Sequence, residues 1–180
     1  MTVIGFDAYR SVIPLDPYAH PQALDDGALE PTIDRLLTIL MTEMKELYET
    51  GDMEHKRRLL RALMNVRPPK EGSEEFIKLQ DSLLWTETIK KGIVEMKDLD
   101  FRDNICLWQG DITRLQCGAI VNAANSQLLG CFQPLHSCID NVIGSDGGIQ
   151  IRNDCNAIMT QQGIEEPTGL AKITRAYNIP

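Results

Sequence analysis

Three runs of apolar residues at helical spacing divide the first half of the chain. In each run the apolar residues recur three and four positions apart, as on one face of a helix. The predicted helices cover residues 31–50, 53–66 and 73–91, with Pro31, Asp52 and Ser73 at their starts. Residues 1–30 carry several prolines and predict an extended arm with turns. We therefore expect an N-terminal arm followed by an all-helical extension, together covering residues 1–100.

The pattern changes in the rest of the chain. NICLWQG (residues 104–110) and CGAIVNAANS (117–126) are short, apolar and bounded by turn residues, which predicts two strands. Residues 149–163 carry a helical apolar face that ends at Gly163, and residues 170–180 form a third candidate strand. Strand, strand, helix, strand is the order of an α/β layer with a crossover helix. Residues 101–180 are therefore expected to form a second unit.

Composition and charge exclude several classes of protein. The 180 residues are 43% hydrophobic and 24% charged, with a formal net charge of −8. This acidic balance argues against nucleic acid as a partner, because phosphate contacts need a clustered basic face. No apolar run approaches the length that spans a bilayer, and the N-terminus lacks a secretion signal. The five cysteines, an odd number, do not suit a secreted disulfide framework. We expect a cytoplasmic protein with no membrane partner.

A cluster of soft metal ligands lies in GCFQPLHSCIDN, residues 130–141. Cys131, His136 and Cys138 offer two thiolates and an imidazole, the ligand types that zinc prefers, and three protein ligands would leave a fourth position open. The alternative is a buried turn in which both thiols pack as small apolar groups and His136 bonds a backbone carbonyl. Spacing alone favours the turn, because the pattern is not among the common zinc-finger spacings.

The segment WQGDITRLQCGAIVNAANSQLLG resembles the opening of a macrodomain. With GCFQPLHSCIDN and the preceding helices, it is similar to the microbial zinc-containing macrodomains. Those proteins reverse protein mono-ADP-ribosylation and often accompany a sirtuin-like transferase. The resemblance runs over residues 110–180 and more loosely over the helices. It implies a mixed sheet with crossover helices and a zinc cofactor. It also implies ADP-ribose, or a mono-ADP-ribosylated protein such as a lipoyl-type carrier, as the ligand.

The resemblance also assigns roles to individual residues. Asp111 matches the acceptor of the adenine amino group, with Ile112 stacking or bonding through its backbone beside it. Asn125 would hold a hydroxyl of the distal ribose, and the role of Asn122 stays open. Asn141 would contact ribose. Each has a plainer alternative as the cap of a turn or helix.

Asp140 lies two residues beyond Cys138, so its carboxylate is close to the predicted metal. It would orient or deprotonate a zinc-bound water, or hold His136 from behind. IGSDGG, residues 143–148, reads as a glycine-rich turn that directs amides at a pyrophosphate. The family has histidine where this chain has Gly144, and Asp146 adds a negative charge.

The family continues with further strands and a second phosphate loop beyond the match to AYNIP at the end of this sequence. We therefore expect a truncated chain with an incomplete sheet and an exposed edge, which predicts strand exchange, a homo-oligomer or poor solubility. The predicted function is a zinc-dependent hydrolase that removes mono-ADP-ribose from acidic side chains of proteins. The sequence leaves open whether this chain is an inactive fragment. The alternatives are a non-catalytic ADP-ribose reader and a helical protein-interaction module.

Overall fold

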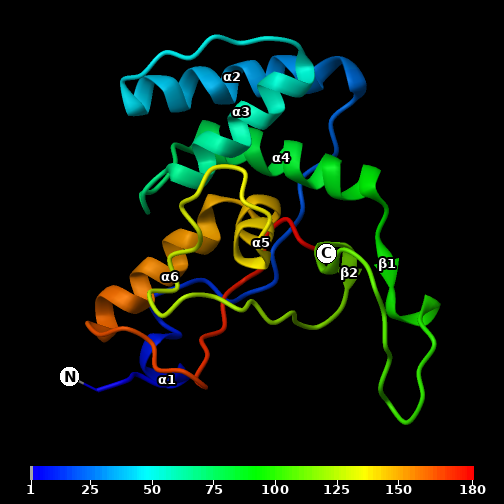
Figure 1. The fold of residues 1–180 in the computed structure, drawn as a ribbon, viewed down its shortest axis with the longest axis vertical. Coiled ribbons are helices and arrows are strands. Elements are labelled where there is room, and N and C mark those ends of the chain that lie inside the picture. The colour runs from blue at the N-terminus through cyan, green and yellow to red at the C-terminus, as the bar shows by residue number, and fades with distance from the viewer. Residues whose placement is uncertain (1) are drawn as a thin grey trace.

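A computed structural model describes residues 2–180 as a largely helical molecule with one small sheet (Figure 1). The α-helices are α1 (Phe6–Tyr9), α2 (Asp26–Met44), α3 (Met53–Val66), α4 (Glu74–Lys91), α5 (Ile139–Gly147) and α6 (Ile149–Gln162). The 3-10 helices are η1 (Met96–Asp98) and η2 (Ile112–Arg114), and the strands are β1 (Val94–Glu95) and β2 (Leu115–Gln116). Helices α2, α3 and α4 lie at one end, and α5 and α6 pack beneath them.

Side-chain caps set the starts of the three long helices. The carboxylate of Asp52 accepts from the amide of His55, and the hydroxyl of Ser73 accepts from that of Phe76, so both predicted starts are confirmed. The first helix differs from the prediction. It begins after Asp25, which caps Ala28, and it contains Pro31 in its interior. It ends at Met44 rather than near Gly51, because Lys45 turns left-handed with φ 57°.

The main hydrophobic core joins helices from both halves of the chain. Leu36 and Leu40 of α2, Leu60 of α3 and Leu84 of α4 are each at most 2% exposed. Ile149 at the start of α6 belongs to the same cluster. The helical extension and α6 therefore bury apolar surface against each other.

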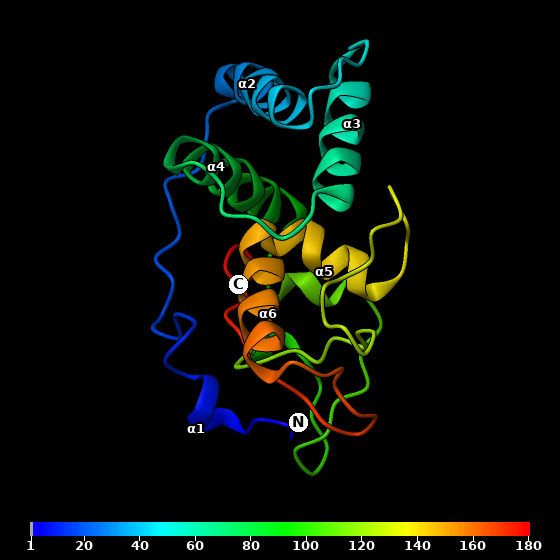
Figure 2. The same ribbon diagram turned by 90° about the vertical axis from the view of Figure 1, so that its left-hand side faces the viewer.

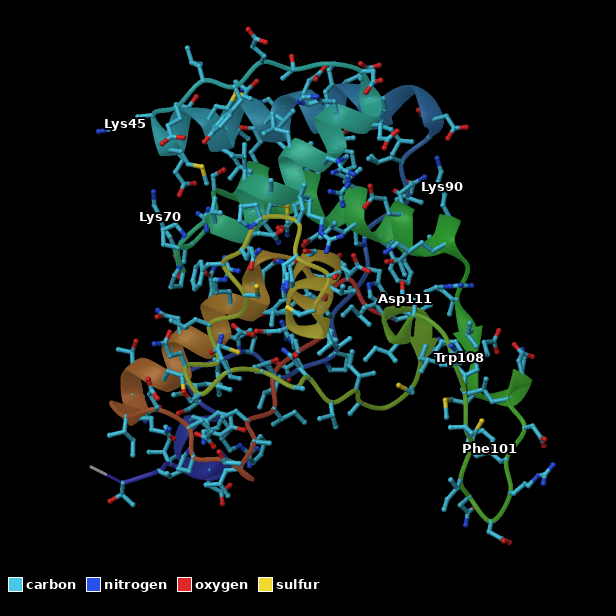
Figure 3. All side chains as sticks on the ribbon, viewed as in Figure 1. Lys45, Lys70, Lys90, Phe101, Trp108 and Asp111 are labelled. Carbon is cyan, nitrogen blue, oxygen red and sulfur yellow. The ribbon has the colours of Figure 1, made fainter. Side chains whose placement is uncertain are left out.

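The predicted strands at 104–110 and 117–126 are wrong, and so is the strand at 170–180, which is irregular. The sheet instead pairs β1 with β2 in parallel, with Val94 opposite Leu115. Leu107 is 100% exposed and Val121 is 87% exposed. An apolar segment becomes a stable strand only where a neighbouring strand and a packed face are present, and neither covers these side chains here. Phe101 and Trp108 lie on the long loop that projects from the molecule (Figure 3).

The helix predicted at 149–163 is confirmed as α6, which ends at Gly163 with a left-handed φ of 70°. The prediction of a glycine-rich turn at residues 143–148 is wrong for most of that segment. Residues 143–147 complete α5, and Gly148, with φ 105°, is the joint between α5 and α6. The amides of 143–147 therefore serve the helix rather than forming an open turn.

The N-terminal arm runs along one side of the molecule from α2 to α1 at the opposite end (Figure 2). Tyr9 and Ile13 of the arm pack against Ile158 of α6 in a second buried cluster. The hydroxyl of Tyr9 also accepts a hydrogen bond from the amide of Ile173. Apart from the short helix α1, the arm has the extended character that its prolines predict. Among residues 2–180, no helix combines the length and the apolar character that crossing a membrane requires.

Candidate metal and ligand site

The three predicted metal ligands meet in the loop that leads into α5. The Sγ atoms of Cys131 and Cys138 and a ring nitrogen of His136 all lie within 4.8 Å of one another. Cys131 Sγ is 3.6 Å from His136 Nδ1. Cys138 is the N-cap of α5, where its sulfur accepts from the amide of Asn141 at 3.4 Å. The loop bends back at Gly130 and Leu135, both with positive φ, and this brings the three donors together.

Asn141 and Arg152 hold this loop from α5 and α6. The buried amide of Asn141 donates to the carbonyl of Gln133 at 3.0 Å. The guanidinium of Arg152 donates to the carbonyl of Leu129 at 2.7 Å and lies over the ring of Phe132, 4.3 Å from its centroid. Burial lowers the pKa of Arg152, and the negative charge of Asp140 opposes that change. Asn141 thus has a structural task, and contact with ribose remains a prediction.

Asp140 lies in the first turn of α5 and is only 8% exposed. Its Oδ1 accepts from Nδ2 of Asn122 at 2.7 Å, so the structure brings two predicted site residues together. The carbonyl oxygen of the Asn122 side chain is buried and has no hydrogen-bond partner within residues 2–180. The Asn122 amide therefore fixes one carboxylate oxygen of Asp140 and keeps an acceptor of its own free.

Asp111 lies beside α5, near the paired strands (Figure 3). Its carboxylate accepts from both the amide and the hydroxyl of Thr113, at 3.0 and 2.7 Å, so it caps η2. Asp111 and Ile112 also line an open cavity of about 460 Å³. Asp146 lines this cavity too, and its charge is balanced by Lys91 at 2.6 Å. The capping role of Asp111 is thus established, and adenine binding stays a prediction.

Asn125 closes a turn of its own loop. Its Nδ2 donates to the carbonyl of Gly130 at 3.1 Å, and its Oδ1 accepts from the amide of Gln127 at 3.1 Å. Both ends of the side-chain amide are thereby engaged, which is the plainer of the two expected roles. A ligand hydroxyl at Asn125 would have to share or replace these bonds.

Two residues of the helical extension reach the site without having been predicted. Arg61 of α3 and Lys91 of α4 both line the cavity beside Asp111. Arg61 borders the apolar face of a helix whose buried residues include Leu60 and Leu63. A charged side chain in that position is more often a solvated neighbour of the apolar face, so local sequence does not predict this role.

Comparison with known proteins finds a matching family model and several similar proteins. Residues 121–180 match the family model of the Macro domain, which confirms the macrodomain part of the resemblance over those residues. A "Protein-ADP-ribose hydrolase" from Treponema medium is 50% identical over 135 residues, which are 72% of this chain and 51% of that protein. One of the same name from Staphylococcus aureus (strain MSSA476) is 50% identical over 124 residues, 68% of this chain and 46% of that protein.

A more distant relative is named "Probable bifunctional ADP-ribose hydrolase/ADP-ribosyltransferase" and comes from Fusarium oxysporum f. sp. cubense. It is 38% identical over 132 residues, covering 66% of this chain and 22% of that protein. The chain spans about half the length of the first two relatives. Residues 121–180 therefore match the Macro domain, and about two thirds of the chain is similar to proteins named protein-ADP-ribose hydrolase.

Proposed function

We propose that this chain forms the metal- and ADP-ribose-binding part of a zinc-dependent hydrolase that removes mono-ADP-ribose from acidic side chains of proteins. The observation that carries the proposal is the convergence of Cys131, His136 and Cys138 within 4.8 Å, with Asp140 following on the first turn of α5. The names of the relatives support the same reaction class.

The donor set fits zinc in type, and the separation between Cys131 and His136 fits it in spacing. Bond lengths of roughly 2.3 Å to sulfur and 2.0 Å to nitrogen place neighbouring ligands of a tetrahedral site about 3.5 Å apart. The separation of 3.6 Å between Cys131 Sγ and His136 Nδ1 agrees with that value. When bound, zinc supplies a Lewis acid that polarises an ester or makes water more acidic.

The protein's own groups would orient and exchange protons around the ribose. Asp140 is buried and held on one oxygen by Asn122, which leaves its other oxygen to accept a proton or to orient a water. Asn125, which closes its own turn in this structure, would bind the distal ribose. Asp111 and Ile112, in the wall of the cavity, would receive the adenine.

The test combines metal content with hydrolysis. The full chain is purified with ample zinc, its zinc content is measured by elemental analysis, and release of ADP-ribose is followed from a mono-ADP-ribosylated lipoyl-type carrier protein. We expect about one zinc per chain, lost in Cys131→Ala but kept in Cys106→Ala, a thiol outside the cluster. Full zinc content and full hydrolysis in Cys131→Ala would refute the proposal. Calorimetric binding of ADP-ribose without release would replace it with a reader.

A further inference from the structure

The segment 131–138 carries the three predicted metal ligands and is called the metal loop below. Helix α3 of the helical extension contacts this loop through two polar side chains one turn apart, Arg61 and Asn65. The Nη2 atom of Arg61 donates to the carbonyl of His136 at 3.3 Å and to Oδ1 of Asn141 at 3.0 Å. Oδ1 of Asn65 accepts from the amide of Leu135 at 3.0 Å. The metal loop is therefore bonded to a helix more than sixty residues earlier in the chain.

The same two side chains also bind α5, which carries the ligand Cys138 at its start. Nδ2 of Asn65 donates to Oγ of Ser145 at 2.9 Å, and that hydroxyl donates to Oδ1 of Asn141 at 3.2 Å. Asn65, Asn141 and Ser145 are all buried. The bonds form a closed network between α3, the loop and α5, in which each helix contributes residues four positions apart.

The network acts on the part of the loop that needs external support. Leu135 has a left-handed φ of 56°, which a branched apolar residue adopts only when its surroundings impose it. Asn65 binds the amide of Leu135, and Arg61 binds the carbonyl of the next residue, His136. These two bonds hold the peptide group before Leu135 and the peptide group after His136, so the backbone is fixed on both sides of the pair of residues that orients the imidazole.

The contacts of Arg61 do not show a side chain that is optimal for the stability of the fold. Its Nε is buried without a hydrogen-bond partner in the described part of the chain. A buried donor left unpaired destabilises the fold, so an apolar or smaller polar side chain would suit the packing better. The guanidinium instead bonds the carbonyl of His136 and the side chain of Asn141, which are the contacts through which Arg61 acts on the loop.

We propose that Arg61 and Asn65 are positioning residues through which the helical extension holds the metal loop in its binding geometry. The inference rests on the proposed zinc site. It goes further in making metal affinity a property of both halves of the chain. Partners that hold a metal ligand from behind commonly change metal affinity or activity by about 10–100-fold when they are replaced.

The first variant is Arg61→Gln in the full chain, with Arg61→Lys and Arg58→Gln beside it. Arg58 is exposed on the same helix, so it matches the change of charge away from the loop. Zinc affinity is measured by competition with a chromophoric chelator, and ligand geometry by the visible spectrum of the cobalt(II) form. We expect about 10–100-fold weaker zinc binding and an altered cobalt spectrum for Arg61→Gln. Arg61→Lys should recover part of the affinity, since an ammonium group reaches one of the two acceptors. Arg58→Gln should match the wild type.

A second measurement separates this inference from the zinc proposal. Hydrogen exchange of the amides of residues 131–138 is compared in metal-free wild type and metal-free Arg61→Gln, at equal thermal stability. Faster exchange confined to the loop supports the positioning role even if the wild type binds no zinc, an outcome that would refute the proposed function alone. Unchanged loop exchange together with wild-type zinc affinity and spectrum would overturn the positioning role.

Discussion

Among the described residues, the side chain of Asn122 is the one hydrogen-bond donor to the carboxylate of Asp140. Its Nδ2 donates to Asp140 at 2.7 Å, while its own oxygen is buried and unpaired within residues 2–180. We predict that Asn122→Ala slows release of ADP-ribose by about 10–100-fold while leaving zinc content unchanged, because the carboxylate loses its orientation and the metal ligands do not. The measurement is single-turnover release with elemental analysis. Gln127→Ala, an exposed neighbour on the same loop, is the control, and equal rates in both variants would contradict the prediction.

Protonation of His20 should make the stability of the protein depend on pH. Its ring stacks on Trp85, with centroids 3.7 Å apart and planes 2° from parallel. Burial lowers the pKa of His20 from its ordinary value of 6.5, and the charge of Asp81 opposes that change. The neutral ring is therefore favoured in the folded state. Its contribution to stability is present above pH 6.5 and is lost as the pH falls through the lowered pKa.

We accordingly expect the midpoint of thermal unfolding to fall more steeply between about pH 7.5 and pH 5.5 in the wild type than in His20→Gln, which has no charge to gain. The emission of Trp85, followed in a Trp108→Phe background, should change over the same range as the arm loosens. Parallel pH profiles of the two proteins would show that the stack carries no such linkage.

The residue types of the site can be predicted from local sequence, but their hydrogen-bond partners cannot. The thiolates and imidazole were found because their chemistry and their spacing lie within one loop. Asp111 and Asn125 each offered a ligand role and a turn role. Local sequence cannot separate these roles, because the same oxygen serves either partner. The structure shows the turn bonds at both residues. Arg61 was missed because its partners lie in a distant loop.

At the scale of elements, the glycines of α5 provide a matched pair. A Cβ at Gly144 would meet no atom within 4 Å, whereas a Cβ at Gly147 would lie 3.1 Å from the carbonyl oxygen of Ala176 and 2.2 Å from Cδ1 of Ile151. Gly144→Ala should raise the free energy of unfolding by about 0.5–1 kcal/mol, because alanine loses less backbone entropy in a helix. Gly147→Ala should lower it by about 1–3 kcal/mol, the usual penalty of overpacking.

Urea unfolding of the two variants measures both effects in the same helix. Ile151 can rotate away, but the carbonyl of Ala176 is backbone and yields less easily, so the sign at Gly147 depends on the C-terminal segment staying docked. A gain of stability in both variants would mean that residues near Ala176 do not pack on α5 in solution.

The contrast between predicted helices and predicted strands has a local cause. The starts of α3 and α4 follow from Asp52 and Ser73, whose side chains cap amides three residues later. A helix satisfies its backbone within one segment, so its signals lie in adjacent residues. A strand needs a partner supplied from elsewhere. The apolar residues of 104–110 and 117–126 are typical of buried strands, yet the pairing that forms uses Leu115–Gln116 between them.

Across the whole molecule, buried polar contacts join the two halves of the chain in addition to the apolar core. The carboxylate of Asp81 in α4 is 3% exposed and accepts hydrogen bonds from Gln150 of α6, Asn178 near the C-terminus and Tyr18 of the arm. Four separate segments therefore meet at one side chain. The order of the arm, the helices and the final segment can be predicted from the sequence. This junction cannot, because its partners lie far apart along the chain.

The exposed apolar loop is the other property of the whole molecule. Leu107 is 100% exposed and Ile105 is 74% exposed. Within the described residues, 106–110 make no backbone–backbone hydrogen bond. An apolar segment with free backbone groups is a template for pairing with another chain. We predict that the protein self-associates through this loop at rising concentration.

Charge placed on the loop should weaken that association without affecting the core. We expect Leu107→Glu to lower the weight-average sedimentation coefficient at high concentration and to leave thermal stability unchanged, since a fully exposed side chain contributes no buried area. Leu47, which is 94% exposed in the loop between α2 and α3, supplies the control. Leu47→Glu makes the same change of charge on an isolated apolar residue. If both variants associate as the wild type does, or if the wild type stays monomeric over the whole range, the loop is not a pairing surface. An effect of Leu107→Glu alone would place the contact there, because the two leucines differ in their surroundings rather than in their exposure.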